Sequence, residues 1–165
     1  MANNFLEQLV AEWYEYRGYY VRRNVWVGKQ GRGGFESELD IVAFNPKARH
    51  LVHVEPSMDA ESWEKRERRF RKKFDAGRKH IPGLFPGLEL PDEIEQIAIL
   101  AFASKINHPT LGGGKVLLVS DLMREILEEL SEKKITSNAV PEHHALLRTL
   151  QFVVEYRKKV FATLR

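Results

Sequence analysis

Two acidic residues, Asp40 and Glu55, stand at the ends of two apolar segments, residues 39–44 and 51–54, which a short turn separates. If the segments pair as an antiparallel hairpin, the start of the first lies beside the end of the second. The two carboxylates then become neighbours at one end of a sheet, where they repel each other unless a cation lies between them. Mg²⁺ is typically bound by one or two carboxylates together with substrate phosphate oxygens. The spacing therefore predicts a divalent-metal site suited to phosphodiester hydrolysis.

The polar residues near this pair also have structural interpretations. Asp40 could instead accept hydrogen bonds from backbone amides or pair with a nearby arginine, because a carboxylate between apolar neighbours needs a partner. Glu38 shares a strand face with Asp40 and is a weaker ligand candidate. His53 shares a face with Glu55, and there a packed, hydrogen-bonded histidine is favoured over a metal ligand.

Positive charge is concentrated in residues 61–80, which hold nine Lys or Arg and four Asp or Glu, although the whole chain carries only +3. Such a concentration predicts a polyanionic partner. The alternative is a solvated helix face with i,i+4 ion pairs such as Glu61–Lys65 and Glu64–Arg68. The sequence leaves both interpretations open.

Apolar periodicity and the Gly and Pro positions predict the elements that must position these residues. A helix is expected over residues 3–17, capped by Asn3 or Asn4 and ended by Gly18. The Gly-rich segment 28–34 reads as a loop, and Pro and Gly recur too often in 81–91 for regular structure. The other expected elements are strands at 19–27, 36–45, 49–56, 94–102 and 115–119, and helices at 60–80, 121–134 and 141–159.

The order helix, three strands, helix, strand resembles the PD-(D/E)XK, or restriction-endonuclease-like, nuclease superfamily. Three residues carry the resemblance: Glu7 in the first helix, Asp40 in Glu-Leu-Asp-Ile-Val, and Glu55 in Val-His-Val-Glu-Pro-Ser. The resemblance implies a single α/β domain over residues 1–165. Its restriction-endonuclease-like core would be a helix, a three-stranded meander, a helix and a further strand on a mixed sheet, with extra C-terminal helices.

The resemblance also implies an activity, Mg²⁺- or Mn²⁺-dependent hydrolysis of DNA phosphodiester bonds. The metal ligands would be Asp40, Glu55 and the carbonyl of Pro56, and Glu7 would orient the water or a second ion. The sequence does not distinguish DNA from RNA as the substrate. Double-strand cutters of this kind often pair, so a homodimer is a further expectation.

One position departs from the family pattern, because Ser57 stands where a lysine is expected two residues after the glutamate. That lysine would hold the attacking water and offset charge in the transition state. Lys72 or Lys73 of the basic helix is expected to replace it. Otherwise the site is impaired and the protein only binds nucleic acid.

Four cations are expected to hold the nucleic-acid backbone without reading sequence: Lys29 and Arg32 in the Gly-rich loop, and Lys65 and Arg69 on the basic helix. For the loop, a plain hairpin connection is the favoured alternative. Besides the nuclease, two other functions stay open. One is a nuclease-like binding module without catalysis, and the other is a protein–protein adaptor that uses the C-terminal helices at 122–130 and 146–156.

Composition limits the remaining choices. The 165 residues suit one domain with one core, and 43 % apolar with 30 % charged residues fits a folded protein. The absence of cysteine excludes disulfides and thiolate metal sites and agrees with a cytoplasmic location. No apolar run approaches the ~20 residues that span a bilayer, so no membrane association is expected.

His143 and His144 are adjacent, so on a helix they would diverge and make poor zinc ligands.

Overall fold

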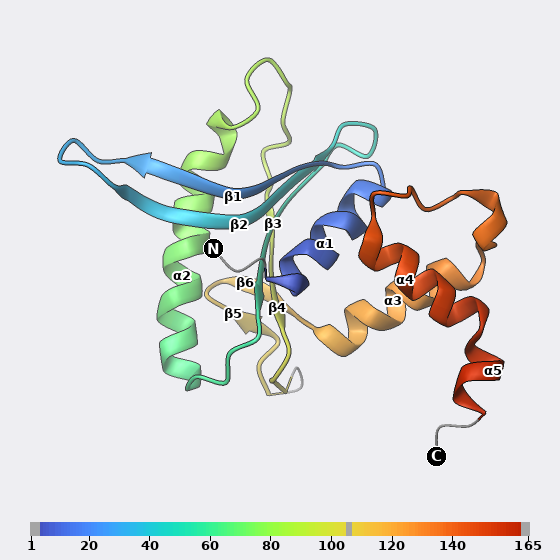
Figure 1. Cartoon of the computed structure of the whole chain (residues 1–165). Helices are drawn as coiled ribbons and strands as arrows, with labels where there is room; N and C mark the ends of the chain where they lie inside the picture. The colour runs from blue at the N-terminus through green and yellow to red at the C-terminus, as the bar shows by residue number, and fades with distance from the viewer. Residues whose placement is uncertain (1–3, 105–106, 163–165) are drawn as a thin grey trace.

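A six-stranded mixed sheet forms the centre of the protein in a computed structural model that describes residues 4–104 and 107–162 (Figure 1). The strand order is β1-β2-β3-β4-β6-β5. The first three strands form an antiparallel meander, β4 and β6 continue the sheet in parallel, and β5 pairs antiparallel with β6. The strands are β1 Tyr20–Lys29, β2 Phe35–Asn45, β3 His50–Ser57, β4 Glu95–Leu100, β5 Thr110–Leu111 and β6 Gly114–Leu118.

Helices cover both faces of this sheet. The basic helix α2 lies on one face, and α1 and α3 lie on the other, where α4 packs against both of them (Figure 1). Single 3₁₀ turns follow α2 at Ile81–Gly83 and precede α4 at Ile135–Ser137. The helices are α1 Phe5–Tyr16, α2 Trp63–His80, α3 Val119–Ser131, α4 Ala145–Glu155 and α5 Arg157–Phe161. None of them, within the part of the chain that is described, has the length and apolar character needed to cross a bilayer.

Alternating side chains of β2 and β3 divide the core into layers. Ile41 and Val54 pack with α1, α3 and α4, whereas Val42 and Leu51 pack with the end of α2 and the turn that follows it. A third cluster joins Phe70 and Phe74 of α2 to β4, β5 and β6. Because successive strand residues point to opposite faces, the polar residues at 53, 55 and 57 of β3 all face α2.

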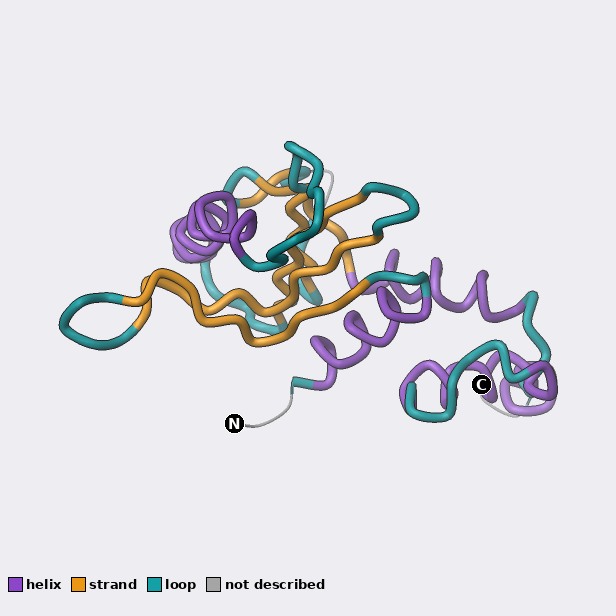
Figure 2. The backbone as a smooth tube through the Cα atoms, turned by 90° about the horizontal axis from the view of Figure 1, so that it is seen from above, coloured by secondary structure: helices purple, strands orange, loops and turns teal. Residues whose placement is uncertain are grey.

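The β1–β2 hairpin extends beyond the rest of the molecule as an arm (Figure 2). Asn24, in the middle of β1, has a left-handed φ of 50°. Val21, before it, packs against the α1 side, whereas Val25 and Val27, after it, pack against the α2 side. Side chains at odd-numbered positions of β1 therefore lie on one face of the sheet before Asn24 and on the other face after it. Simple alternation along the sequence did not predict this change.

Most predicted elements are present, with shifted ends. Asn4 caps α1, because its side chain accepts a 3.1 Å hydrogen bond from the Leu6 amide, and the alternative cap at residue 3 lies outside the described residues. The prediction of one helix over 141–159 was wrong: residues 141–144 form a turn, and Tyr156 (φ −95°, ψ 7°) separates α4 from α5. No Gly or Pro marks that break, and the short strand β5 was not predicted.

Candidate active site

The two predicted carboxylates meet where β2 pairs with β3. The register aligns Ile41 with Val54, so Asp40 and Glu55 occupy the adjoining positions. The Asp40 amide donates a 3.1 Å hydrogen bond to Glu55 Oε1. The Glu55 side chain is 2 % exposed, whereas 15 % of the Asp40 side chain is accessible to solvent. The hairpin therefore places one buried and one accessible carboxylate side by side.

A chain of hydrogen bonds fixes the Glu55 carboxylate from behind. His53 Nε2 lies 2.8 Å from Glu55 Oε1, and both side chains are buried. On the other side of the ring, Gln96 Nε2 donates to His53 Nδ1 at 3.2 Å and to the Phe74 carbonyl at 2.8 Å, while Arg78 donates to Gln96 Oε1. Since Nδ1 accepts, the neutral ring carries its proton on Nε2 and donates it to Glu55.

His53 stays neutral because burial and, to a smaller extent, the nearby Lys73 cation lower its pKa to about 3. Gly77 of α2 passes directly over the imidazole ring. A Cβ atom at Gly77 would lie 2.7 Å from His53 Cε1 and closer still to Nδ1. The missing side chain of Gly77 thus lets α2 approach β3. The structure agrees with the interpretation of His53 as a packed, hydrogen-bonded histidine.

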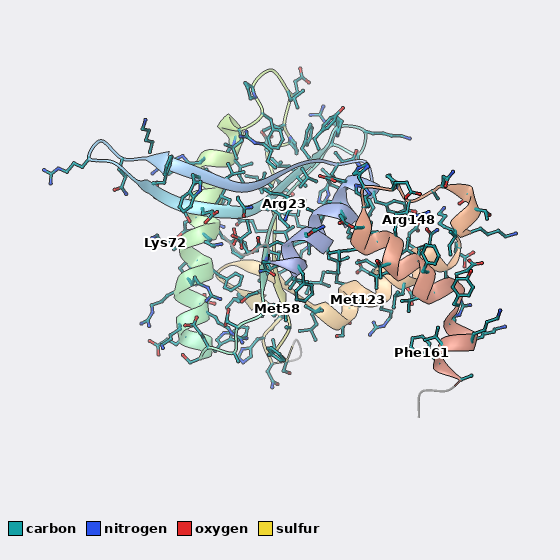
Figure 3. The ribbon with its side chains drawn as sticks, in the orientation of Figure 1. Arg23, Met58, Lys72, Met123, Arg148 and Phe161 are labelled. Atoms are coloured by element: carbon teal, nitrogen blue, oxygen red, sulfur yellow. The ribbon has the colours of Figure 1, made fainter. Side chains whose placement is uncertain are left out.

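Lys73 of α2 provides the cation of the site. Its Nζ donates to Asp40 Oδ1 at 2.5 Å and also to Glu55 Oε2. Burial alone would lower the pKa of Lys73, but the two carboxylates outweigh burial and raise it. Of the two lysines that the sequence predicted to replace the motif lysine, only Lys73 reaches the acids. Lys72 is exposed on α2 (Figure 3).

The carboxylates around Lys73 hold their protons more tightly than usual. Burial and the neighbouring Glu55 raise the pKa of Asp40 to about 7, and burial also raises the pKa of Glu55. Burial and the charges of Asp40 and Glu7 raise the pKa of Glu38. Glu7 therefore lies within electrostatic reach of this group, although its Oε1 accepts a 2.9 Å hydrogen bond from Asn4 Nδ2 at the start of α1. The raised pKa values show that Lys73 alone does not offset burial and repulsion among these acids, and a second cation would favour their ionised forms.

Ser57, which stands at the position of the family's lysine, is hydrogen-bonded to other side chains of the protein. Ser57 Oγ donates to Asp59 and accepts a 3.2 Å hydrogen bond from Arg69 Nη2. Arg69, expected to contact nucleic acid, also binds Asp59 directly, so its guanidinium is engaged within the protein. Pro56 is buried in β3 beside Ile99 of β4, and its carbonyl as a metal ligand stays a prediction.

The remaining predicted phosphate contacts are spread over the surface. Lys29 and Arg32 are exposed at the end of the β1–β2 arm, where the Gly-rich segment forms the hairpin connection. Lys65 is exposed on the first turn of α2. The predicted Glu61–Lys65 pair is replaced by Glu61–Arg69 at 2.7 Å.

Two residues that sequence analysis did not single out organise the site. Gln96 fixes the tautomer of His53, and Asp59 joins Arg69 to Arg66, whose Nε lies 3.0 Å from Asp59 Oδ1. Arg66 is 4 % exposed although it lies within a run of exposed cations. The sequence gives little signal for these residues, because Gln96 follows the charged Glu95 and Asp59 lies in a polar segment.

The prediction that His143 and His144 lie on a helix was wrong. Both precede α4 instead of lying on it. Their rings are 4.3 Å apart, and Glu15 of α1 joins them in a group whose potential ligand atoms all lie within 4.8 Å of one another. The third partner comes from the opposite end of the chain, so spacing in the sequence could not show it.

The donor set at Asp40 and Glu55 fits a hard divalent cation. Both side chains offer carboxylate oxygens, which are the ligands that Mg²⁺ and Mn²⁺ prefer. The His53 ring donates to Glu55 from behind, as outer hydrogen bonds do for metal-binding carboxylates.

Asp40→Asn is expected to stabilise the protein at alkaline pH in the absence of divalent ions. The pKa of Asp40 rises from its ordinary 3.8 to about 7 on folding, so the folded state binds more protons between these values and stability falls as pH rises through them. The variant should match the wild type near pH 4 and exceed its free energy of unfolding by about 2–4 kcal/mol near pH 8. Urea unfolding across this range measures the difference. A constant difference at every pH would contradict the argument.

Comparison of the chain with protein-family models, with curated proteins and with solved structures gives no match in any of the three. The description of the chain as an α/β protein with a six-stranded mixed sheet therefore rests on the structure itself.

Proposed function

We propose that this protein is a restriction-endonuclease-like nuclease that hydrolyses DNA phosphodiester bonds with Mg²⁺ or Mn²⁺. One observation carries the proposal: Lys73 of α2 donates to both Asp40 and Glu55. The PD-(D/E)XK pattern needs two acids and a lysine at one point, and here Ser57 leaves the strand without that lysine. A cation from the neighbouring helix supplies the same group.

Each residue of the site has a distinct part in the proposed reaction. Asp40 and Glu55 would hold the ion, and His53 keeps the Glu55 carboxylate in one orientation through its Nε2 proton. When bound, the ion lowers the pKa of a water molecule and polarises the scissile phosphate. The ammonium group of Lys73 stabilises negative charge that develops on the phosphate oxygens.

The surface around this site favours a polyanion as substrate. Exposed cations of α2, such as Lys65 and Lys72, and Lys29 and Arg32 of the arm offer phosphate contacts at separate points. None of these contacts depends on base identity, so binding without sequence preference and with a steep salt dependence is expected.

Cutting of supercoiled plasmid DNA tests the proposal. The wild-type protein should produce nicked and then linear DNA in Mg²⁺ or Mn²⁺, and EDTA should stop the reaction, because the carboxylates alone activate no water. Asp40→Asn protein, purified in the same way, controls for contaminating nuclease. Salt-dependent DNA binding without cutting would support the binding module instead, and the absence of both would favour the adaptor.

A further inference from the structure

A group of possible metal ligands lies apart from the carboxylates at Asp40, where the end of α1 meets the start of α4. We propose that Glu15, His143 and His144 bind a transition-metal ion, with Zn²⁺ as the reference case, between the end of α1 and the start of α4. The three residues offer ligand atoms that all lie within 4.8 Å of one another. Two imidazoles and one carboxylate form a donor set that suits Zn²⁺ and its neighbours better than Mg²⁺.

The geometry of the closest pair already suits a shared ion. His144 Nε2 and Glu15 Oε2 lie 3.0 Å apart. Two donors that are each about 2.0–2.1 Å from a tetrahedral zinc ion lie roughly 3.3 Å apart, so only a small displacement separates this hydrogen bond from joint coordination. The His143 ring lies 4.3 Å from the His144 ring, at an interplanar angle of 63°.

Only one of the two ring nitrogens of His144 has a hydrogen-bond partner among the described residues. The residue is 3 % exposed, and its Nδ1 is buried without a hydrogen-bond partner among the described residues. Nε2 is the ring nitrogen beside Glu15 Oε2, so it is the atom that would bind the ion, and Nδ1 would then carry the ring proton. Glu15 and His143 are both exposed, so an ion from solvent can reach the group.

The neighbouring residue Glu12 holds the site in place. Glu12 is 5 % exposed, and its Oε2 accepts hydrogen bonds from the backbone amides of Leu146 and Leu147 at 2.9 and 3.0 Å. This contact caps the first turn of α4 with a side chain of α1. Glu15 lies three residues after Glu12 on the same face of α1. The cap therefore fixes the distance between Glu15 and the histidines that immediately precede α4.

Bound metal would tie the C-terminal helices to α1. Three protein ligands leave a fourth tetrahedral position for water, which is the pattern of an accessible zinc site. The ion bridges segments more than 120 residues apart in the sequence, so its main measurable effect is on thermal stability.

Zinc binding by an Asp40→Asn protein tests the proposal, because that background weakens the other candidate site. Equilibrium dialysis against Zn²⁺ should give about one ion per chain, and saturating Zn²⁺ should raise Tm by roughly 5 °C. Co²⁺ should give the visible absorption of a site with nitrogen and oxygen ligands. In the same background, His143→Ala and Glu15→Gln should lose at least tenfold in affinity and most of the Tm shift.

Glu142→Gln is the matched control, because Glu142 adjoins the histidines but pairs with Arg148 at 3.1 Å. It should bind Zn²⁺ as its parent does. Both test substitutions change exposed side chains, and melting without metal establishes that each variant folds. Equal zinc affinity in the parent and in His143→Ala, or no stoichiometric binding by the parent, would overturn the proposal.

Discussion

Lys73→Ala is expected to reduce the rate of Mg²⁺-dependent DNA cutting by about 10²–10³-fold, whereas Lys72→Ala should keep it within about threefold. The Lys73 ammonium contacts both carboxylates of the site, and Lys72 is exposed at the preceding position of the same helix. Each substitution removes one positive charge from α2, so both weaken general attraction for the DNA backbone to a similar extent. In the proposed reaction, only Lys73 lies where negative charge would develop on the phosphate oxygens.

Single-turnover cutting of a radiolabelled duplex, with protein in excess, separates the chemical step from binding. A gel-shift assay on the same two variants should show similar affinities. Because Lys73 is partly buried, its removal leaves the repelling carboxylates without a counter-ion, and urea unfolding checks that the variant is folded under the assay conditions. Equal loss of rate in both variants would mean that α2 contributes only non-specific charge.

Gly77→Ala is expected to destabilise the protein by about 3 kcal/mol. Alanine favours a helix over glycine by ~1 kcal/mol, so helix propensity alone predicts the opposite sign. The added methyl group would overlap the His53 ring. That ring cannot move away without breaking its hydrogen bonds to Glu55 and Gln96, so α2 must shift from β3. Guanidinium unfolding monitored by circular dichroism measures the cost.

Gly31→Ala is the matched control for this prediction. Gly31 lies in the exposed hairpin connection, a Cβ there meets nothing within 4 Å, and its φ lies outside the left-handed region. Both substitutions restrict the unfolded chain equally, so the difference between them reports on the folded state. Gly31→Ala should stay within about 0.5 kcal/mol of the wild type. A Gly77→Ala protein as stable as this control would contradict the close approach of α2 to β3.

The sequence predicted those parts of the site that depend on neighbouring residues. The two apolar segments around one turn sufficed to pair Asp40 with Glu55, because a hairpin register follows from the turn and the alternation of side chains. The choice between Lys72 and Lys73 required the orientation of α2 about its own axis. Phe70, Phe74 and Gly77 set that orientation by packing against the sheet, and the distance from either lysine to the carboxylates follows only from where the sheet lies.

The features that escaped prediction join residues far apart in the chain. Gln96 reaches His53 from β4, and Glu15 reaches His144 from α1. Nothing in the local spacing of either residue indicates such a partner. Asn24 is a different case, because its left-handed backbone reverses the faces of β1 within a segment whose composition indicates an ordinary strand.

The hydrogen bonds behind Glu55 also bear on the order in which the carboxylate pair is assembled during synthesis. His53 receives its second partner, Gln96, from β4, and β3 gains its parallel neighbour from the same strand. A nascent chain that ends before residue 95 has both acids and Lys73 but leaves the imidazole tautomer unfixed and one edge of β3 open. In newly made protein, the hydrogen bonds that orient His53 behind Glu55 can therefore be complete only after β4 has left the ribosome.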